Sequence, residues 1–97
     1  MHIKIPHKFS QQEGVEKVRL LLNEARSKLG DKATIEEERW EANVLHFAFS
    51  AQGQRISGQL TVQDKVFELD AKLPLMMKLF EGKIARMIED QAKNALG

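Results

Sequence analysis

The chain has no cysteine, only two prolines and almost no net charge. Without cysteine it can form neither a disulfide nor a thiolate metal site, and catalysis by a thiol is excluded. The same absence fits a reducing compartment. The net charge is +1, and basic residues are interleaved with nearly as many acidic ones, so no strong field would attract nucleic acid or a charged membrane. We therefore predict no nucleic-acid partner.

Long hydrophobic runs are also missing. No window approaches the roughly 20 apolar residues that span a bilayer, and Met1–His7 contains no apolar stretch of signal-peptide length. We expect a cytoplasmic protein without a transmembrane segment, which would contact lipid or polymer only peripherally. Its 97 residues predict a single domain, residues 1–97, with a modest core that needs neither disulfide nor metal.

A strand and a helix are predicted in the first third of the chain. Isoleucine alternates with polar residues over residues 2–5, until Pro6 ends the strand. Ser10 and Glu13 have the spacing of a capping box, which marks a helix start. Five apolar residues then recur at steps of three and four: Val15, Val18, Leu22, Ala25 and Leu29. With Gly30 as the stop signal, this pattern predicts an amphipathic helix over residues 10–29.

The hydrophobic period changes to two in the middle of the chain. Apolar and polar residues alternate in four segments joined by short turns: residues 33–40, 45–50, 56–62 and 67–73. This alternation predicts an antiparallel meander with one dry and one wet face. Trp40 has the same parity as Glu36 and Glu38, so either a bulge intervenes or the indole covers the sheet edge. The sequence leaves its facing open.

The C-terminal quarter, residues 75–94, is predicted to form one long helix. Its apolar side on a helical wheel consists of Met77, Phe80, Ile84, Met87, Ile88 and Ala95. The element order is thus β-α-β-β-β-β-α. We predict an α+β fold in which a four- to five-stranded antiparallel meander sheet curls around the C-terminal helix and two helices cover its apolar face. This arrangement resembles a reduced helix-grip fold.

Recognisable catalytic and metal-binding patterns are absent. The three histidines, His2, His7 and His46, have no local ligand spacing, and we expect them on the surface. The acidic run at residues 36–38 is better explained as a solvated strand than as an acid–base pair. No serine lies in a G-x-S-x-G motif, and the glycines form no phosphate-binding loop. We predict no catalytic residue, no metal and no cofactor.

The charged side of the last predicted helix carries two leucines. Leu75 and Leu79 lie among three basic residues, Lys78, Lys83 and Arg86. An apolar spot with a basic rim suits docking on a hydrophobic partner, which would be a polymer surface, a lipid headgroup layer or a second subunit. The alternative is that the first helix packs there and buries both leucines. The residues alone leave these two interpretations open.

Two further hypotheses concern the interior. In the first, the curled sheet and the last helix enclose a cavity for a lipid-like ligand, lined by Phe47, Phe49, Phe67, Met77, Phe80 and Met87. In the second, less favoured because no nucleophile or base is recognisable, the protein is an enzyme acting on hydroxyacyl thioesters.

A family resemblance covers nearly the whole chain. Its residues are Ile5-Pro6-His7 leading into Ser10, Trp40-Glu41 before Leu45-His46-Phe47, Gly58 within Ile56-Ser57-Gly58-Gln59-Leu60, and Leu73 followed by Leu75, Leu79, Lys83 and Ile84. In their order and spacing the chain resembles the small polyhydroxyalkanoic acid system proteins, the bacterial granule-region family. It departs from them at Leu73-Pro74, where Leu-Gly is expected, and in a more acidic second strand.

The resemblance implies a role in a bacterial cytoplasm, associated with polyhydroxyalkanoate granules or with binding of a hydrophobic ligand. It implies no catalytic residues. Our leading hypothesis is a non-enzymatic module that docks on the granule or on a protein that coats it, through Leu75, Leu79 and the three basic residues around them. A homodimer formed through the same surface competes with this hypothesis.

Overall fold

The structure, a computed structural model, describes the backbone of residues 1–96 and the side chains of residues 1–95. The elements in order are β1 (His2–Pro6), α1 (Gln11–Leu29), the short 3-10 helix η1 (Gly30–Lys32), β2 (Thr34–Glu41), β3 (Val44–Ala51), β4 (Gln54–Gln63), β5 (Val66–Lys72), α2 (Leu75–Lys78) and α3 (Glu81–Leu96). The five strands form one antiparallel sheet in the order β1-β5-β4-β3-β2. The predicted α+β fold is confirmed.

Strands β2 to β5 form the predicted meander, and β1 returns to pair with β5. The three connecting turns each contain a non-glycine residue at positive φ: Ala42, Gln52 and Lys65. Such backbone matches the twist that short hairpin loops need. The three hairpins that the alternation predicts are all present in the structure.

Helix α1 begins as its sequence predicts. The Glu13 N–H donates to Ser10 Oγ and the Ser10 N–H donates to the Glu13 carboxylate, both at 3.2 Å. These bonds hold the pKa of Glu13 below its ordinary value of 4.5, and the bond from the Ser10 backbone N–H contributes most. At the other end Gly30 adopts a positive φ of 51° and its N–H donates to the carbonyl of Arg26. The capping box and the glycine stop are both confirmed.

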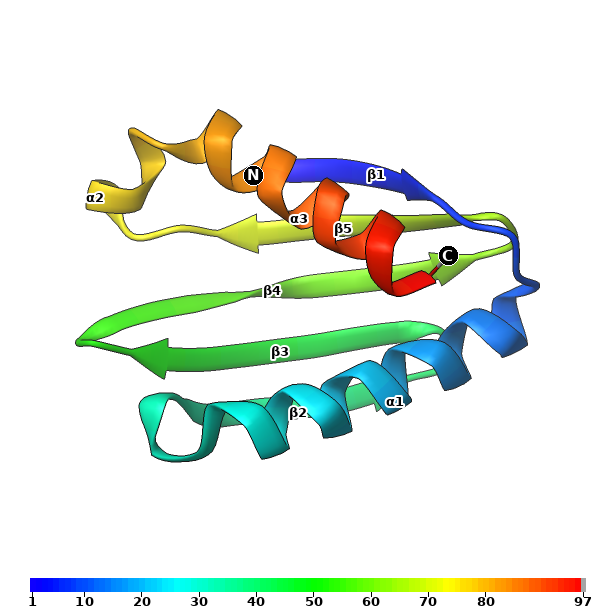
Figure 1. The fold of residues 1–97 in the computed structure, drawn as a ribbon, viewed down its shortest axis with the longest axis horizontal. Coiled ribbons are helices and arrows are strands. Elements are labelled where there is room, and N and C mark those ends of the chain that lie inside the picture. The colour runs from blue at the N-terminus through cyan, green and yellow to red at the C-terminus, as the bar shows by residue number, and fades with distance from the viewer. Residues whose placement is uncertain (97) are drawn as a thin grey trace.

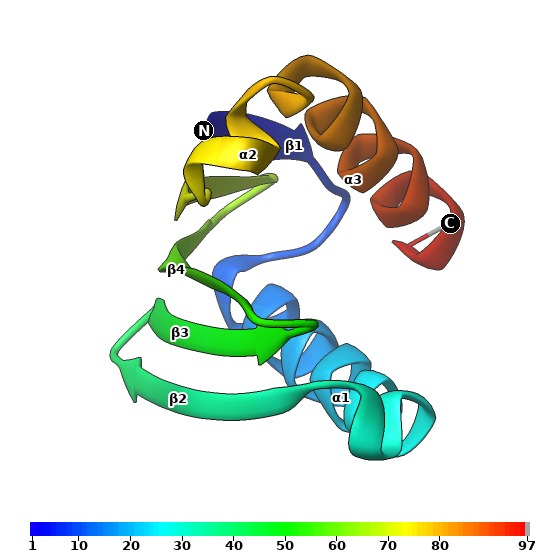
Figure 2. The same cartoon turned by 90° about the vertical axis from the view of Figure 1, so that its left-hand side faces the viewer.

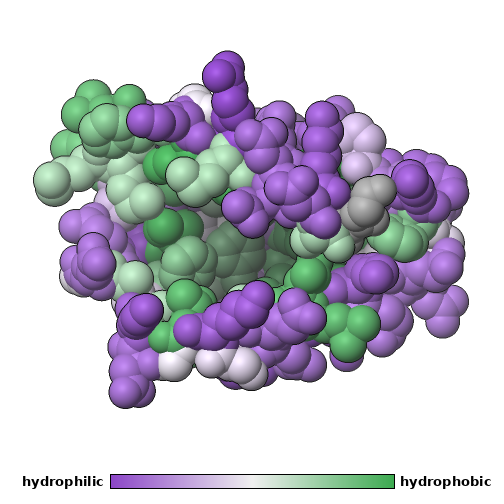
Figure 3. Space-filling view, viewed as in Figure 1, coloured by the Kyte–Doolittle hydropathy of each residue, from purple (hydrophilic) through white to green (hydrophobic). Residues whose placement is uncertain are grey.

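Both long helices lie on the concave face of the coiled sheet, and their backbones stand apart in both views (Figures 1 and 2). Helix α1 packs against β4 and extends along the half of the sheet that contains β2 and β3, whereas α3 packs against β1. The sheet coils sharply: in Figure 2 it passes from β2 and β3 at the bottom, past β4 at the left, to β1 at the top. A hollow is therefore left between the helices, and Figure 3 shows it lined by hydrophobic residues.

Gly58 in β4 permits this sharp coil. A Cβ atom at this position would lie 2.1 Å from the carbonyl oxygen of Asp70 and 2.7 Å from Cα of Ala71, both in the backbone of β5. Backbone atoms of a paired strand cannot move aside as a flexible side chain can. Only glycine fits this close approach, which is a recognised role of glycine within strands.

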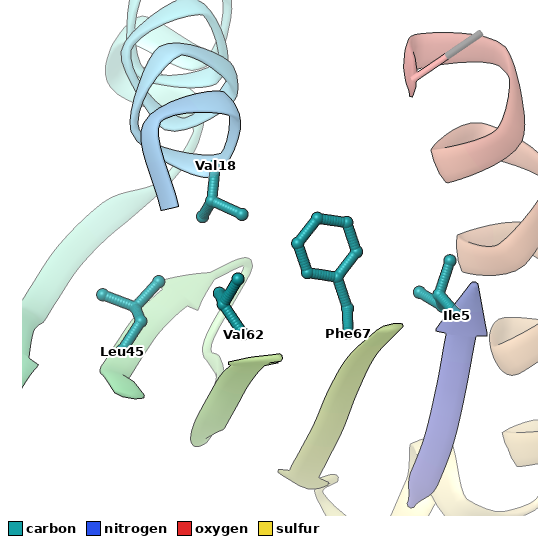
Figure 4. Close-up of a cluster of buried hydrophobic side chains, with 5 residues drawn as sticks. All are labelled: Ile5, Val18, Leu45, Val62 and Phe67. Atoms are coloured by element: carbon teal, nitrogen blue, oxygen red, sulfur yellow. The ribbon is translucent and has the colours of Figure 1, made fainter. Parts of the chain in front are cut away.

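The core gathers at one end of the sheet, where β1 leads into α1. It consists of Ile5, Val18, Leu45, Val62 and Phe67 (Figure 4). Val62 is fully buried and Phe67 is 4% exposed. Val18 reaches down from α1 toward Val62, and Gly14 one turn earlier allows the helix to come this close, since a Cβ there would lie 2.8 Å from Val62 Cγ1. This end is tightly packed.

His7 is buried at this packed end. Its burial corrects the expectation that all three histidines lie on the surface. Its Nδ1 accepts a hydrogen bond from the Phe9 N–H at 3.0 Å, so its Nε2 is the nitrogen that donates, at 2.9 Å, to the carbonyl of Gln63. The ring also packs on Phe67 with centroids 4.1 Å apart. Both ring nitrogens of His7 have hydrogen-bond partners, so the residue is a structural part of the core. His2 and His46 instead carry partly exposed side chains that pair with glutamates.

The C-terminal region differs from its prediction. The single helix over residues 75–94 is broken into α2 and α3, with Leu79 and Phe80 in the turn between them. The Phe80 N–H bonds to the carbonyl of Met77, three residues back, which tightens the chain and redirects it. Helix α3 then lies against β1 and packs Ile88 and Ala92 on the core. A straight helix from Leu75 would keep one direction and miss this contact.

Candidate functional site

The turn from α2 into α3 forms an exposed apolar corner, made of Leu75, Met76, Leu79 and Phe80. Their exposed fractions are 81%, 72%, 85% and 59%. The corner projects at the upper left of Figure 1, and the same region is hydrophobic in the space-filling view of Figure 3. Helix α2 contains no buried residue. Side chains of this size are usually buried, so a group of them in contact with water marks an interaction surface.

The local sequence explains why the corner projects. Pro74 cannot continue the ladder of β5, and its carbonyl accepts hydrogen bonds from Met77 at 2.9 Å and Lys78 at 3.1 Å, which closes a single helical turn. Leu73 before it is buried, whereas Leu75 after it is exposed. The chain thus leaves the core within two residues.

All five residues of the predicted docking surface are exposed in the structure: Leu75, Lys78, Leu79, Lys83 and Arg86. The interpretation in which α1 packs over both leucines is excluded, because α1 lies on the other half of the sheet. Met76 and Phe80 also belong to the corner, although the predicted docking surface contains neither: the wheel of a continuous helix places Phe80 inward, and Met76 is not among the predicted residues. The break at residues 79–80 carries no proline or glycine that could have signalled it.

A second feature is an apolar hollow of about 340 Å³ between the second half of α1 and strands β2 to β5. Its wall is almost entirely apolar. From the helix it is formed by Leu22, Ala25 and Leu29 among others, and from the sheet by Ile35, Phe47, Phe49, Leu60 and Leu69. It lies on the concave side visible in Figure 3.

The predicted cavity set divides in the structure. Phe47 and Phe49 line the hollow. Phe67 instead fills the core, and Met77 is half-buried within α2 without lining the hollow. Phe80 and Met87 correct the prediction most clearly, because they are 59% and 58% exposed rather than internal. Phe80 lies in the break between the two helices, and α3 faces the core with Ile88 and Ala92, which leaves Met87 outside its packed side.

A β-bulge in β2 settles the facing of Trp40. The register shifts between Ile35 and Glu37, so Ile35, Glu38 and Trp40 pair with Phe49, Phe47 and Leu45. All three side chains therefore belong to the concave face. Trp40 packs against the core and Arg19 of α1 stacks on its ring at 5.1 Å. The bulge alternative from the sequence was correct.

The same bulge separates the acidic run. Glu38 lies on the concave face, where it forms an ion pair with Arg26 of α1. Glu36 accepts hydrogen bonds from the Ser50 hydroxyl and from Arg55, at 2.9 Å for the latter, and these lower its pKa from 4.5, the Ser50 bond contributing most. Glu37 pairs with Arg39 at 3.5 Å. Each carboxylate has its own cationic or hydroxyl partner, which fits the solvated-strand interpretation.

One group of residues has the composition of a metal site. His2, Glu68 and Asp70 place ligand atoms within 4.8 Å of one another on the outer face of β1 and β5. His2 and Asp70 are directly opposed in register, and the His2 ring lies 2.9 Å from the Glu68 carboxylate. Cross-strand pairing of exposed residues accounts for this proximity.

Within the described residues, no helix has the length and apolar character needed to span a bilayer.

These features define a small α+β protein, built on one coiled antiparallel sheet, that leaves large apolar side chains uncovered on a corner and in a hollow. The chain belongs to the family of the polyhydroxyalkanoic acid system proteins: the model described as "putative polyhydroxyalkanoic acid system protein" matches residues 1–96. The family name associates the chain with the polyhydroxyalkanoate system. Neither a curated protein nor a solved structure matches it.

Proposed function

We propose that this protein is a non-enzymatic cytoplasmic module that docks on the polyester surface of polyhydroxyalkanoate granules through the apolar corner. The observation that carries the proposal is the exposure of Leu75 and Leu79 on a projecting turn. Family membership supports this choice of partner, because the polymer of the polyhydroxyalkanoate system is a hydrophobic polyester. Lys78 and Lys83 beside the corner remain in water at the rim.

The energy available at the corner is sufficient for docking. Full burial of one leucine, methionine or phenylalanine contributes about 1.5–3 kcal/mol. Four such side chains, reduced by the cost of ordering and of lost translational freedom, suffice for reversible attachment. A projecting corner inserts into a soft apolar surface more readily than it packs on a second copy of itself, because an isologous contact needs a broad patch that is complementary to itself.

The test is sedimentation of the full chain with protein-free polyhydroxyalkanoate particles. The double variant Leu75→Asp with Leu79→Asp is expected to lose most binding and to unfold at the same temperature as the wild type. Leu20→Asp is the matched control, since Leu20 is 60% exposed on α1, far from the corner. Unchanged sedimentation of a folded double variant would refute the proposal. Binding only to particles that carry native coat proteins, or only self-association of the chain, would also refute it.

A second candidate function is transport or storage of a hydrophobic ligand, and the apolar hollow of about 340 Å³ specifically favours it. Ligand pockets typically measure about 300–1,000 Å³, so this hollow suits one small ligand. Native mass spectrometry of the protein with added fatty acids tests this candidate. Retention of no ligand at any chain length would remove it.

The non-enzymatic part of the proposal is supported by the buried histidine, since both ring nitrogens of His7 are engaged in structural hydrogen bonds. Hydroxyacyl thioesters incubated with the protein should show no hydrolysis above the rate in buffer. Turnover that follows the protein through purification would overturn this part.

A further inference from the structure

The apolar hollow borders a polar space at the C-terminal end of α1. This second space, here called the vestibule, measures about 440 Å³. The two share Leu29, Ala33 and Ile35 in their walls. The hollow is almost purely apolar, whereas the vestibule adds the polar side chains of Arg26, Asp31 and Thr34. A ligand that fills both must therefore be apolar at one end and polar at the other.

Arg26 stands where the polar part of such a ligand would lie. It ion-pairs with Glu38, which the β2 bulge brings to the concave face and into the wall of the hollow. Its Nη1 donates to Asn23 at 3.1 Å. A guanidinium carries five N–H donors, so these two bonds hold its position while other donors can reach a ligand oxygen. The Arg26 side chain is about half exposed, as a group at an entrance should be.

We propose that the hollow and the vestibule together bind one single-chain acyl compound, with its apolar chain in the hollow and its carboxylate at Arg26. This inference rests on the second candidate function and assigns its ligand class and orientation. A hollow of about 340 Å³ suits one chain better than the two chains of a diacyl lipid. Asp31 in the vestibule repels any anionic head, and it repels a doubly charged phosphate more strongly than a singly charged carboxylate. The Thr34 hydroxyl offers a second polar contact.

The probes are decanoate, 1-decanol and decyl phosphate, titrated into the full-length protein and followed by calorimetry and by NMR. Decanoate is expected to bind more tightly than decanol or decyl phosphate, and its chain protons should contact Phe47 and Leu60. Arg26→Gln should weaken decanoate about 10-fold or more and leave decanol unchanged. Arg19→Gln is the matched control, because Arg19 lies on the same helix but stacks on Trp40. Ala25→Trp, which fills the hollow, should abolish binding of both.

The possible outcomes distinguish the carrier function, the orientation of the ligand and the location of its site. Absence of saturable binding by any probe would overturn the carrier function together with this inference. Saturable binding of decanoate that Arg26→Gln and Arg19→Gln affect equally would leave a carrier but overturn the assigned orientation. Binding that survives Ala25→Trp, with NMR contacts outside Phe47 and Leu60, would overturn the assigned site. Thermal unfolding of each variant confirms that it is folded, and none of these results depends on the apolar corner.

Discussion

The two ends of the sheet are built in opposite ways. At the end where β1 leads into α1, Val62 is fully buried, the glycine of α1 nearest the sheet leaves no room for a methyl group, and His7 fastens the β4–β5 turn. At the other end, α1 and α3 stand apart over an apolar hollow, and the α2 corner exposes four large apolar side chains. The packed end supplies stability. The open end leaves apolar surface in water, which a protein selected for stability alone would cover.

The largest expected effect comes from the glycine that shapes both ends. Gly58→Val should abolish cooperative unfolding, because its side chain would overlap the backbone of β5 at Asp70 and Ala71. Gly82→Ala in α3 is the control, since nothing lies within 4 Å of its Cβ position, and it should stabilise the protein by about 0.5–1 kcal/mol. Circular dichroism during heating measures both. A Gly58→Val protein that unfolds like the wild type would show that the coil does not depend on this residue.

The contrast between the ends also predicts the cost of losing a large side chain. Phe67→Ala, in the packed core, should lower the free energy of unfolding by about 3–5 kcal/mol. Leu79→Ala, on the corner, should change it by no more than about 0.5 kcal/mol, because Leu79 is already 85% exposed. Urea denaturation compares them. Equal losses would mean that the corner is packed in solution and the comparison fails.

Enlarging a side chain should change the free energy of unfolding in opposite directions at the two ends. Gly14→Ala places a methyl group 2.8 Å from Val62 Cγ1 and should destabilise the protein by about 1 kcal/mol or more. Ala25→Leu extends into the apolar hollow and should stabilise it by about 0.5–1 kcal/mol. Both measurements use urea denaturation of the protein without added ligand. Destabilisation by Ala25→Leu would indicate that the hollow is already closed in solution.

The first helix and the three hairpins could be predicted from the sequence because their signals are local. The Ser10–Glu13 capping box, the glycine stop at Gly30 and the period-two segments each specify structure within a few neighbouring residues. The helix break that forms the apolar corner could not be predicted. The break at Leu79–Phe80 arises because α3 packs on β1, a contact between residues far apart in the chain. Sequence periodicity cannot register such a contact, so Phe80 and Met87 were placed inside.

The candidate site shows the same division. Leu75 and Leu79 could be identified from sequence because a leucine on a charged arc is anomalous wherever the helix lies. The hollow could be identified only in part, through Phe47 and Phe49. Its helical wall and the approach of Arg26 to Glu38 depend on the distance between α1 and the sheet, and on one extra residue in β2. In the sequence, the only sign of that bulge was that the parity of Trp40 left the direction of its side chain undecided.

The smallest expected effect concerns the outer face of the open end, where Glu36 bonds to Ser50 and Arg55. These bonds lower the pKa of Glu36 in the folded protein below 4.5, so its contribution to stability is present above that pH and is lost as the pH falls through the folded value. Glu36→Gln should therefore reduce the urea midpoint slightly at neutral pH, and the difference from the wild type should shrink as the pH falls below 4.5. Glu13, whose pKa is lowered by the helix cap at the packed end, titrates in both proteins and cancels in this difference. A difference that persists at low pH would assign the role of Glu36 to packing in the strand rather than to its charge.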